Sequence, residues 1–247
     1  MIAYSSYLRG GGELTDDIWS AIEQIADRAV KNWNLPDCGI WEVRGPMKHF
    51  VHSKVMCWRA VDGAVALGES LERGAELERW REARDQIRSS ILRDGWNEEI
   101  GSFVQFYGAR HTDASLLMIP FVGFLPPTDA RMRATVKRIR EELEEDGLIR
   151  RYRPDRTDDG LGGGQEGAFL MCTLWLAGYL TMIGEIEEAE QMFQRVLTKA
   201  NSLGLFSEMV NPQTGEMLGN FPQAFTHLSL IHTARNLDAA ISAAARA

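Results

Sequence analysis

The sequence predicts an all-α protein in which buried inner helices alternate with amphipathic outer helices. Apolar residues recur at helical spacing along most of the 247 residues, with no convincing run of strand alternation. The stretches 74–94 and 128–146 are amphipathic and rich in Arg and Glu, as outward-facing helices should be. The stretches 112–122 and 166–183 are apolar nearly all round, which predicts burial on every side.

The first predicted helix begins after Thr15, whose hydroxyl can cap it, with Asp16 and Asp17 in its first turn. The residues expected on its buried face are Ile18, Ile22, Ile25, Ala29 and Trp33. Further helices are predicted at 50–72, 74–94, 112–122, 128–146, 166–183, 185–203 and 222–245.

Long loops containing glycine, aromatic and polar residues precede the more buried helices, at 34–47, 95–111, 147–165 and 204–221. The glycines in them recur roughly every 55–60 residues, the length of one helical hairpin with its loop. We therefore predict concentric rings of inner and outer helices, with every long loop on one rim. The alternative is an irregular helical bundle.

The composition indicates one large soluble domain and excludes several function classes. Hydrophobic residues make up 45% of the chain and charged residues 25%, with a net charge of −8 and no basic run, which argues against nucleic acid as a partner. No apolar run approaches the ~20 residues that span a membrane, and the amino terminus does not resemble a secretory signal. Cys38, Cys57 and Cys172 lack metal-ligand spacing and are expected to stay reduced, which suits a cytoplasmic chain without metal or cofactor.

Two loop glutamates have aromatic neighbours that suit acid–base chemistry. Glu42 follows Trp41 in the string DCGIWEVRG, and Glu208 lies in the string LFSEM. A carboxyl group packed against an indole and shielded from water keeps its proton to higher pH, so Glu42 is expected to be a desolvated acid. The alternative is that each glutamate only caps a helix.

A series of strings, in order along the chain, resembles the glucoamylase-type inverting glycoside hydrolases of family fifteen, which include bacterial trehalases. The strings are GIWEVRG (39–45), HFVHSKVMCW (49–58), GWNEEIGSFVQFYG (95–108), DASLL (113–117), GLIRRY (147–152), DGLGGGQEGAFLMCTLW (159–175), NSLGLFSE (201–208) and LGNFPQAFTHLSLI (218–231). The resemblance implies an (α/α)6 toroid. This chain would be a single partial catalytic domain, residues 1–247, with about eight or nine of twelve helices. Residues 1–9 resemble the end of an inner helix.

The resemblance also implies roles for the two glutamates, with Glu42 as the general acid and Glu208 as the general base. Inversion requires the two carboxyl groups to lie roughly 6.5–9.5 Å apart, which leaves space for a water. Asp113 is expected to cap or orient the helix at 112.

Five further residues are candidates for substrate binding. Trp41 offers a flat wall for a sugar, or is simply part of the core. Arg44 orients the acid, contacts sugar hydroxyls or forms a structural salt bridge. Arg151 and Tyr152 resemble the arginine–tyrosine pair of a substrate-lining loop in this family. Glu166 is expected to open a buried helix, where the helix dipole alone would favour an acid.

The predicted function is inverting hydrolysis of an α-glucosidic bond, in trehalose or in malto- or isomalto-oligosaccharides, with release of glucose. One alternative is a non-catalytic fragment that needs a partner to supply the missing amino-terminal helices; another is a sugar-binding subunit. The open edge of an incomplete barrel would expose apolar surface and allow association. Met209 and Gly63 depart from the usual residues of this family, which leaves relaxed selection and altered specificity both open.

Overall fold

The computed structural model describes residues 7–8, 10–73, 76–157 and 166–246, in which helices dominate. The helices are α2 (Asp16–Asn32), α3 (Val51–Ser70), α4 (Leu77–Asp94), α5 (Met118–Phe121), α6 (Ala130–Leu143), α7 (Leu170–Met182), α8 (Ile186–Leu197) and α9 (Ala224–Ala244), with a 3-10 helix, η1 (Ala114–Leu117), before α5. The expected cap of α2 is confirmed, because the hydroxyl of Thr15 accepts a hydrogen bond from Ile18 N at 3.3 Å.

Short antiparallel strands occur only within the loops of the described part of the chain. They are β1 (Trp96–Asn97) with β2 (Ser102–Phe103), β3 (Glu144–Glu145) with β4 (Leu148–Ile149), and the sheet β5 (Ala168–Phe169), β6 (Met209–Val210) and β7 (Met217–Leu218). In the last sheet Phe169 pairs with Met209, and Met209 pairs with Leu218. This register joins the segment before α7 to the segment that contains Glu208.

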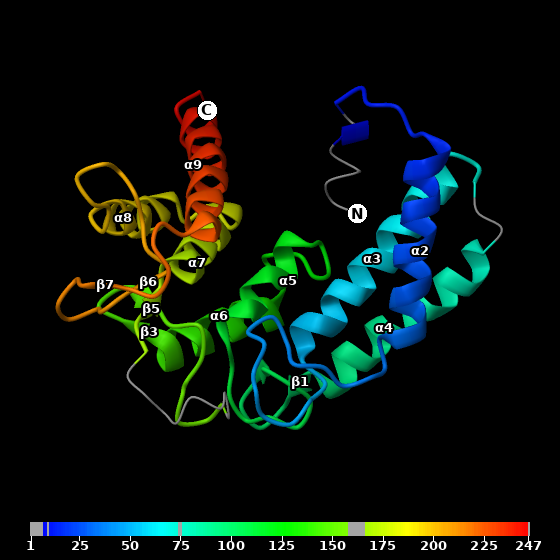
Figure 1. Cartoon of the computed structure of the whole chain (residues 1–247), viewed down its shortest axis with the longest axis horizontal. Helices are drawn as coiled ribbons and strands as arrows, with labels where there is room; N and C mark the ends of the chain where they lie inside the picture. Colours follow the sequence, from blue (N-terminus) through cyan, green and yellow to red (C-terminus); the bar gives the residue numbers. More distant parts are fainter. Residues whose placement is uncertain (1–6, 9, 74–75, 158–165, 247) are drawn as a thin grey trace.

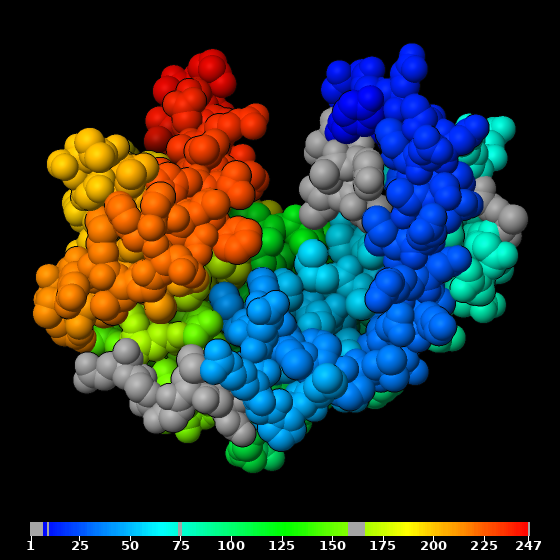
Figure 2. Space-filling view, viewed as in Figure 1, coloured from blue at the N-terminus to red at the C-terminus, as the bar shows by residue number. Residues whose placement is uncertain are grey.

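The helices form an arc that is open between α9 and α2 (Figure 1). Helix α3 packs against α2 and α4, α5 contacts α3 and α7, and α7 packs against α8 and α9. The space-filling view shows the same opening as a hollow between the two ends of the arc (Figure 2). The prediction of an all-α, incomplete toroid is confirmed.

The predicted alternation of buried and amphipathic helices is confirmed by burial. Most residues of α7 are buried, as its sequence LMCTLWLAGYLTM requires, whereas α8 buries only Ala189, Met192 and Val196 on one face. Within the described ranges, no helix is long and apolar enough to cross a membrane.

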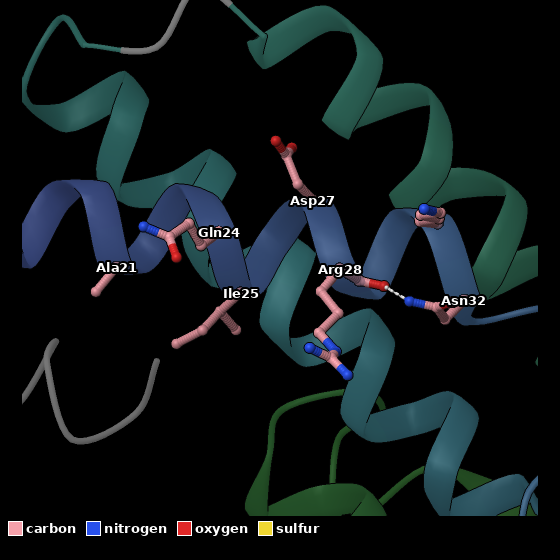
Figure 3. A pocket seen from close by; sticks show the side chains of 7 residues that line it. Ala21, Gln24, Ile25, Asp27, Arg28 and Asn32 are labelled. Carbon is pink, nitrogen blue, oxygen red and sulfur yellow. Dashed lines mark hydrogen bonds between the residues drawn. The ribbon is translucent and has the colours of Figure 1, made fainter.

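The prediction that Ile25 of α2 is buried in the core is wrong. Trp19 and Ala26 are buried, whereas Ile25 is 42% exposed, because the face that packs on α3 is centred between Trp19 and Ile22. Ile25 instead lines an exposed groove along α2 (Figure 3), in which the Asn32 side chain donates to the carbonyl of Arg28. One polar helix supplies every lining residue of this groove, so we assign it no catalytic role.

Two predicted helices begin later than expected. The stretch 112–122 forms only η1 and the single turn of α5, which contains Pro120. The stretch 166–183 starts with β5, so Glu166 does not open a helix, and α7 begins at Leu170. Pairing with β6 draws residues 168 and 169 into a strand despite their apolar helical pattern.

The first two long loops and residues 147–157 of the third lie on the lower side of the arc in Figure 1, and the fourth, with β6 and β7, lies beside β5 on the left. Phe50 and Phe106 form an isolated antiparallel β-bridge, and Ala114 N donates to the carbonyl of Arg151 at 2.8 Å. These contacts bring together the loops or the segments that follow them, and the pairing of β5 with β6 joins the segment after the third loop to the fourth loop. The possible inner helix at residues 1–9 and the glycine run 162–164 lie largely or wholly outside the described residues.

Candidate active site

The segment Leu35–Val43, which we call the acid loop, is fastened at its start by a buried lysine. The ammonium of Lys54, 2% exposed, donates to the carbonyl of Leu35 at 2.5 Å and pairs with a carboxylate oxygen of Asp37 at 3.4 Å. The other oxygen of Asp37 accepts from the hydroxyl of Ser53 and from Gly39 N, each at 2.7 Å. The loop is therefore tied to the first turn of α3.

Glu42 lies at the tip of the acid loop with its side chain exposed. Its φ of 50° lies in the left-handed region, which is unfavourable for a residue with a Cβ. Backbone hydrogen bonds hold this turn, from Glu42 N to the carbonyl of Gly39 and from Val43 N to that of Cys38. The expectation of a water-shielded Glu42 is wrong for this structure, because the turn directs the residue to the open rim.

Trp41 is half-buried among aromatic side chains from three other segments. Its ring lies 5.7 Å from that of Phe169, 6.2 Å from that of Trp175 and 6.4 Å from that of Tyr152, between centroids. The guanidinium of Arg151 lies 6.0 Å from the ring centroid. Much of the Trp41 ring therefore packs in the core, which was the alternative to a role in binding. That the ring also forms a flat wall for a sugar stays a prediction.

The indole of Trp41 is held by Asp113, a contact that the sequence did not predict. The indole Nε1 donates to a carboxylate oxygen of Asp113 at 2.7 Å, and the hydroxyl of Ser115 donates to the other oxygen at 2.7 Å. Asp113 precedes η1, as expected, but its carboxyl group binds the distant Trp41 as well as the nearby Ser115. Burial raises the pKa of Asp113 to about 6, against the lowering effect of hydrogen bonds from Ser115, Trp41 and Gln105.

Glu208 lies in the segment Leu205–Gln223, which we call the base loop. One of its carboxylate oxygens accepts from the backbone N and the side-chain amide of Asn220, each at 3.2 Å, and the other accepts from the side-chain amide of Gln223 at 3.3 Å. The backbone of Glu208 also donates to the carbonyl of Asn220 at 2.9 Å. The loop itself thus supplies three donors to the carboxylate, which orient it.

Gly219 allows the base loop to close on Glu208. Its φ is +73°, and an added Cβ would lie 2.6 Å from a carboxylate oxygen of Glu208. Glycine is therefore required here for its backbone conformation and for the close approach of the carboxylate.

Of the other predicted binding residues, Arg151, Tyr152 and Glu166 are connected by contacts, whereas Arg44 lies apart from them. Arg151 pairs with the carboxylate of Glu166, and Arg150 donates to the carbonyl of Glu166. Tyr152 is 1% exposed and packs its ring against that of Trp41, so it supports the site from the core. Arg44 is exposed and forms no ion pair within the described ranges, so the salt-bridge alternative for it is not observed.

Phe169 connects the acid loop to the base loop. Its ring contacts Trp41, the neighbour of Glu42, and its backbone pairs with Met209, the neighbour of Glu208. The next residue, Leu170, donates its backbone N to the carbonyl of Glu208 at 3.2 Å. The two loops therefore meet on the same short strand at the rim.

Among the described residues, no group of three or more His, Cys, Asp and Glu side chains could hold a metal ion. The rim instead carries carboxylates, aromatic rings and arginines.

A family model described as glycosyl hydrolases family 15 matches residues 1–235. This chain belongs to glycosyl hydrolase family 15. The match covers both loops and all the candidate residues, so the resemblance inferred from the ordered strings is confirmed.

Curated relatives of this family 15 chain are trehalases. The chain is 45% identical to the trehalase of Mycobacterium tuberculosis over 220 residues, which are 89% of this chain and 32% of that protein. It is 40% identical to the trehalase of Thermoplasma volcanium over 240 residues, which are 97% of this chain and 38% of that protein. The chain thus spans about a third of the length of these relatives.

Solved structures share the fold. A protein titled "Glycosidase Wild Type" superposes with a TM-score of 0.79 at 22% identity, covering 95% of this chain and 63% of that one. A bacterial glucoamylase complexed with acarbose gives a TM-score of 0.76 at 16% identity, covering 90% of this chain and 38% of that one. At these identities the likeness concerns the architecture of the family 15 chain alone.

Proposed function

We propose that this chain carries the acid–base pair of a hydrolase that cleaves an α-glucosidic bond with inversion. Glu42 protonates the glycosidic oxygen, and Glu208 removes a proton from the attacking water. The observation that carries this proposal is the meeting of the acid loop and the base loop at Phe169, since two segments far apart in sequence then present one glutamate each at a common rim.

The surroundings of each glutamate support its proposed role. The exposed carboxyl of Glu42 can reach a leaving-group oxygen, and the carboxylate of Glu208 is oriented by Asn220 and Gln223. Arg151, paired with Glu166 and lying over aromatic rings, forms the floor against which a sugar would bind.

Trehalose is the substrate that we favour over malto- and isomalto-oligosaccharides. The reason is the 40–45% identity to proteins named trehalase, together with family membership. The purified chain should therefore release glucose from trehalose faster than from maltose or isomaltose. Equal or greater release from maltose would move the assignment to malto-oligosaccharides.

The stereochemistry tests the inverting mechanism directly. Inverting hydrolysis of trehalose gives one β-glucose and one α-glucose, whereas retention gives α-glucose only. Proton NMR of the anomers before mutarotation distinguishes the two outcomes. Early product containing α-glucose alone would overturn the roles assigned to Glu42 and Glu208.

We also propose that the open edge of the arc associates with the further helices of a family 15 toroid. Helix α9, which borders the opening (Figure 1), exposes Phe225, Leu228 and Ile231, each 58–62% accessible. Adding the remaining part of a trehalase relative as a separate polypeptide should then raise glucose release. The same addition should have less effect on a chain with Leu228→Glu.

A further inference from the structure

We propose that Asp113 is the positioning residue of the acid loop: its buried carboxyl holds the Trp41 indole and thereby fixes the turn that presents Glu42. This inference rests on the proposed function of Glu42 for its catalytic meaning, but the contact can be tested without any activity. The two bonded residues are 72 positions apart in the chain.

The first support is the burial of Asp113. The residue is 1% exposed, and a carboxyl group removed from water is costly unless its oxygens are hydrogen-bonded. Both oxygens are satisfied, by the Trp41 indole and by the Ser115 hydroxyl. Ser115 is a local partner and Gln105 belongs to the loop 95–111, so the bond to Trp41 is the one that reaches the acid loop.

The second support is the backbone strain at Glu42. A left-handed φ on a residue with a Cβ costs on the order of 1–3 kcal/mol and persists only where the surroundings determine it. Trp41 immediately precedes this residue, and Val43, 5% exposed, immediately follows it. A fixed indole on one side and a buried valine on the other hold the strained turn in place.

The third support is that the packing of Trp41 does not by itself fix the ring. Its aromatic neighbours are tilted at 36–63° with centroids 5.7–6.4 Å away, contacts that act across a broad range of orientations. The hydrogen bond at 2.7 Å is directional. Asp113 therefore selects one orientation of the indole from those that the apolar contacts permit.

The titratable groups around Asp113 are few and can be separated from it. Burial raises the pKa of the Cys172 thiol, whose charge would interact with those of Asp113, Arg151 and Glu166, so this thiol stays neutral. Burial lowers the pKa of His111, which bonds to the side-chain oxygen of Gln105 rather than to Asp113. Asp113 is the group bonded directly to the Trp41 indole.

The molecule contains a matched control for this contact. The indole of Trp80 donates to a carboxylate oxygen of Asp27 at 2.8 Å, in the packing of α2 against α4. No rim loop takes part in that bond. If indole–carboxyl bonds contribute only to stability, Asp113→Leu and Asp27→Leu, which each remove the acceptor, should affect turnover alike.

The test uses the whole chain with its seven tryptophans labelled with ¹⁵N at the indole. In the native chain the Trp41 indole resonance, assigned by Trp41→Phe, should shift with a midpoint near pH 6 as Asp113 ionises. Asp113→Asn should abolish that titration, while Asp27→Asn should move only the Trp80 resonance. A Trp41 resonance that titrates unchanged in Asp113→Asn would overturn the inference.

Turnover of trehalose supplies the second readout. Asp113→Leu and Trp41→Phe each remove the bond and should lower kcat about tenfold with little change in KM, because the bond acts on the placement of the acid. Asp27→Leu should stay within about twofold of the native chain. An equal loss in Asp27→Leu would contradict the inference. If even the native chain releases no glucose, the proposed function fails, and the indole titration still decides the inference about Asp113.

Discussion

The acid loop and the base loop each bring a glutamate to the rim, but they are held in opposite ways. In the described part of the chain, no hydrogen bond reaches the carboxyl of Glu42, and its loop is anchored from outside by Lys54 and Asp113. The carboxylate of Glu208 is held from within its own loop, by Asn220 and Gln223. The carboxyl group of Glu42 is thus unbound while its loop is anchored, whereas the carboxylate of Glu208 is itself held by hydrogen bonds.

This difference fits the two proposed tasks. A general acid must leave its proton accessible to the leaving group, so donors that occupied its oxygens would compete with catalysis. A general base must stay ionised and aimed at one water, which hydrogen-bond donors favour. The acid should therefore be sensitive to changes at distant buried residues, and the base to changes in its own loop.

The largest expected effect is on kcat, and substrates with different leaving groups distinguish the roles of the two glutamates. Glu42→Gln and Glu208→Gln should each lower kcat for trehalose by about 10²–10⁴-fold, the usual contribution of an acid or a base. With α-glucosyl fluoride, whose leaving group needs no protonation, Glu42→Gln should recover most activity and Glu208→Gln none. Steady-state kinetics on both substrates measure this, and loss of both activities in Glu42→Gln would contradict its role as the acid.

The next effect concerns the buried anchor of the acid loop and its dependence on pH. The folded pKa of Asp113, about 6, lies above its ordinary value of 3.8, so its contribution to stability is fully present below pH 4 and is lost as the pH rises through 6. Relative to the native chain, Asp113→Asn should gain about 2.4 kcal/mol in unfolding free energy between pH 4 and pH 7. Urea unfolding at both pH values measures this difference.

His52, next to the Lys54–Asp37 pair that fastens the acid loop, gives a comparison of opposite sign. Burial lowers its pKa to about 4 from 6.5, against the raising effect of Asp37. Its contribution to stability is therefore present above pH 6.5 and is lost as the pH falls through 4. His52→Gln should lose relative stability over the interval in which Asp113→Asn gains it. The same slope in both variants would contradict the assigned burial of these groups.

The contrast between the loops also explains what the sequence could predict. Helices that bury a whole face, such as α3 and α7, are evident from local apolar spacing, and so are the two glutamates from the strings that surround them. The role of Asp113 was not evident, because its partner Trp41 is 72 positions away and no local pattern marks the pair. The base loop was equally hidden, since Asn220 and Gln223 become donors only after the turn at Gly219 has formed.

Errors in the predicted elements have the same origin. Ile25 lies on the apolar side of α2, but its burial depends on how α3 packs against that helix. Glu166 precedes a long apolar run, yet pairing with Val210 and Met209 turns the start of that run into a strand. Partners distant in the chain decided both outcomes, and helical periodicity contains no information about them.

A smaller effect tests the lysine that fastens the acid loop. Lys54→Met removes the donor to Leu35 O and the partner of Asp37, and should lower the unfolding free energy by about 2 kcal/mol, since Asp37 keeps part of its contact with water. Lys137→Met, at an exposed pair with Glu141, should change it by less than about 0.5 kcal/mol. Amide hydrogen exchange should quicken at residues 35–43 in the first variant only, and slow exchange there would show that Lys54 is not an anchor.

The smallest effect on stability tests the base loop through the turn that closes on Glu208. Gly219→Ala and Gly184→Ala both place a Cβ on a left-handed backbone, with φ of +73° and +84°, and should each cost about 1 kcal/mol of stability. Only the first Cβ meets the Glu208 carboxylate, whereas that of Gly184 meets nothing within 4 Å. We therefore expect kcat to fall about tenfold in Gly219→Ala and to stay unchanged in Gly184→Ala. Equal kcat values in the two variants would mean that the base loop does not set the position of its own carboxylate, and the distinction from the acid loop would be lost.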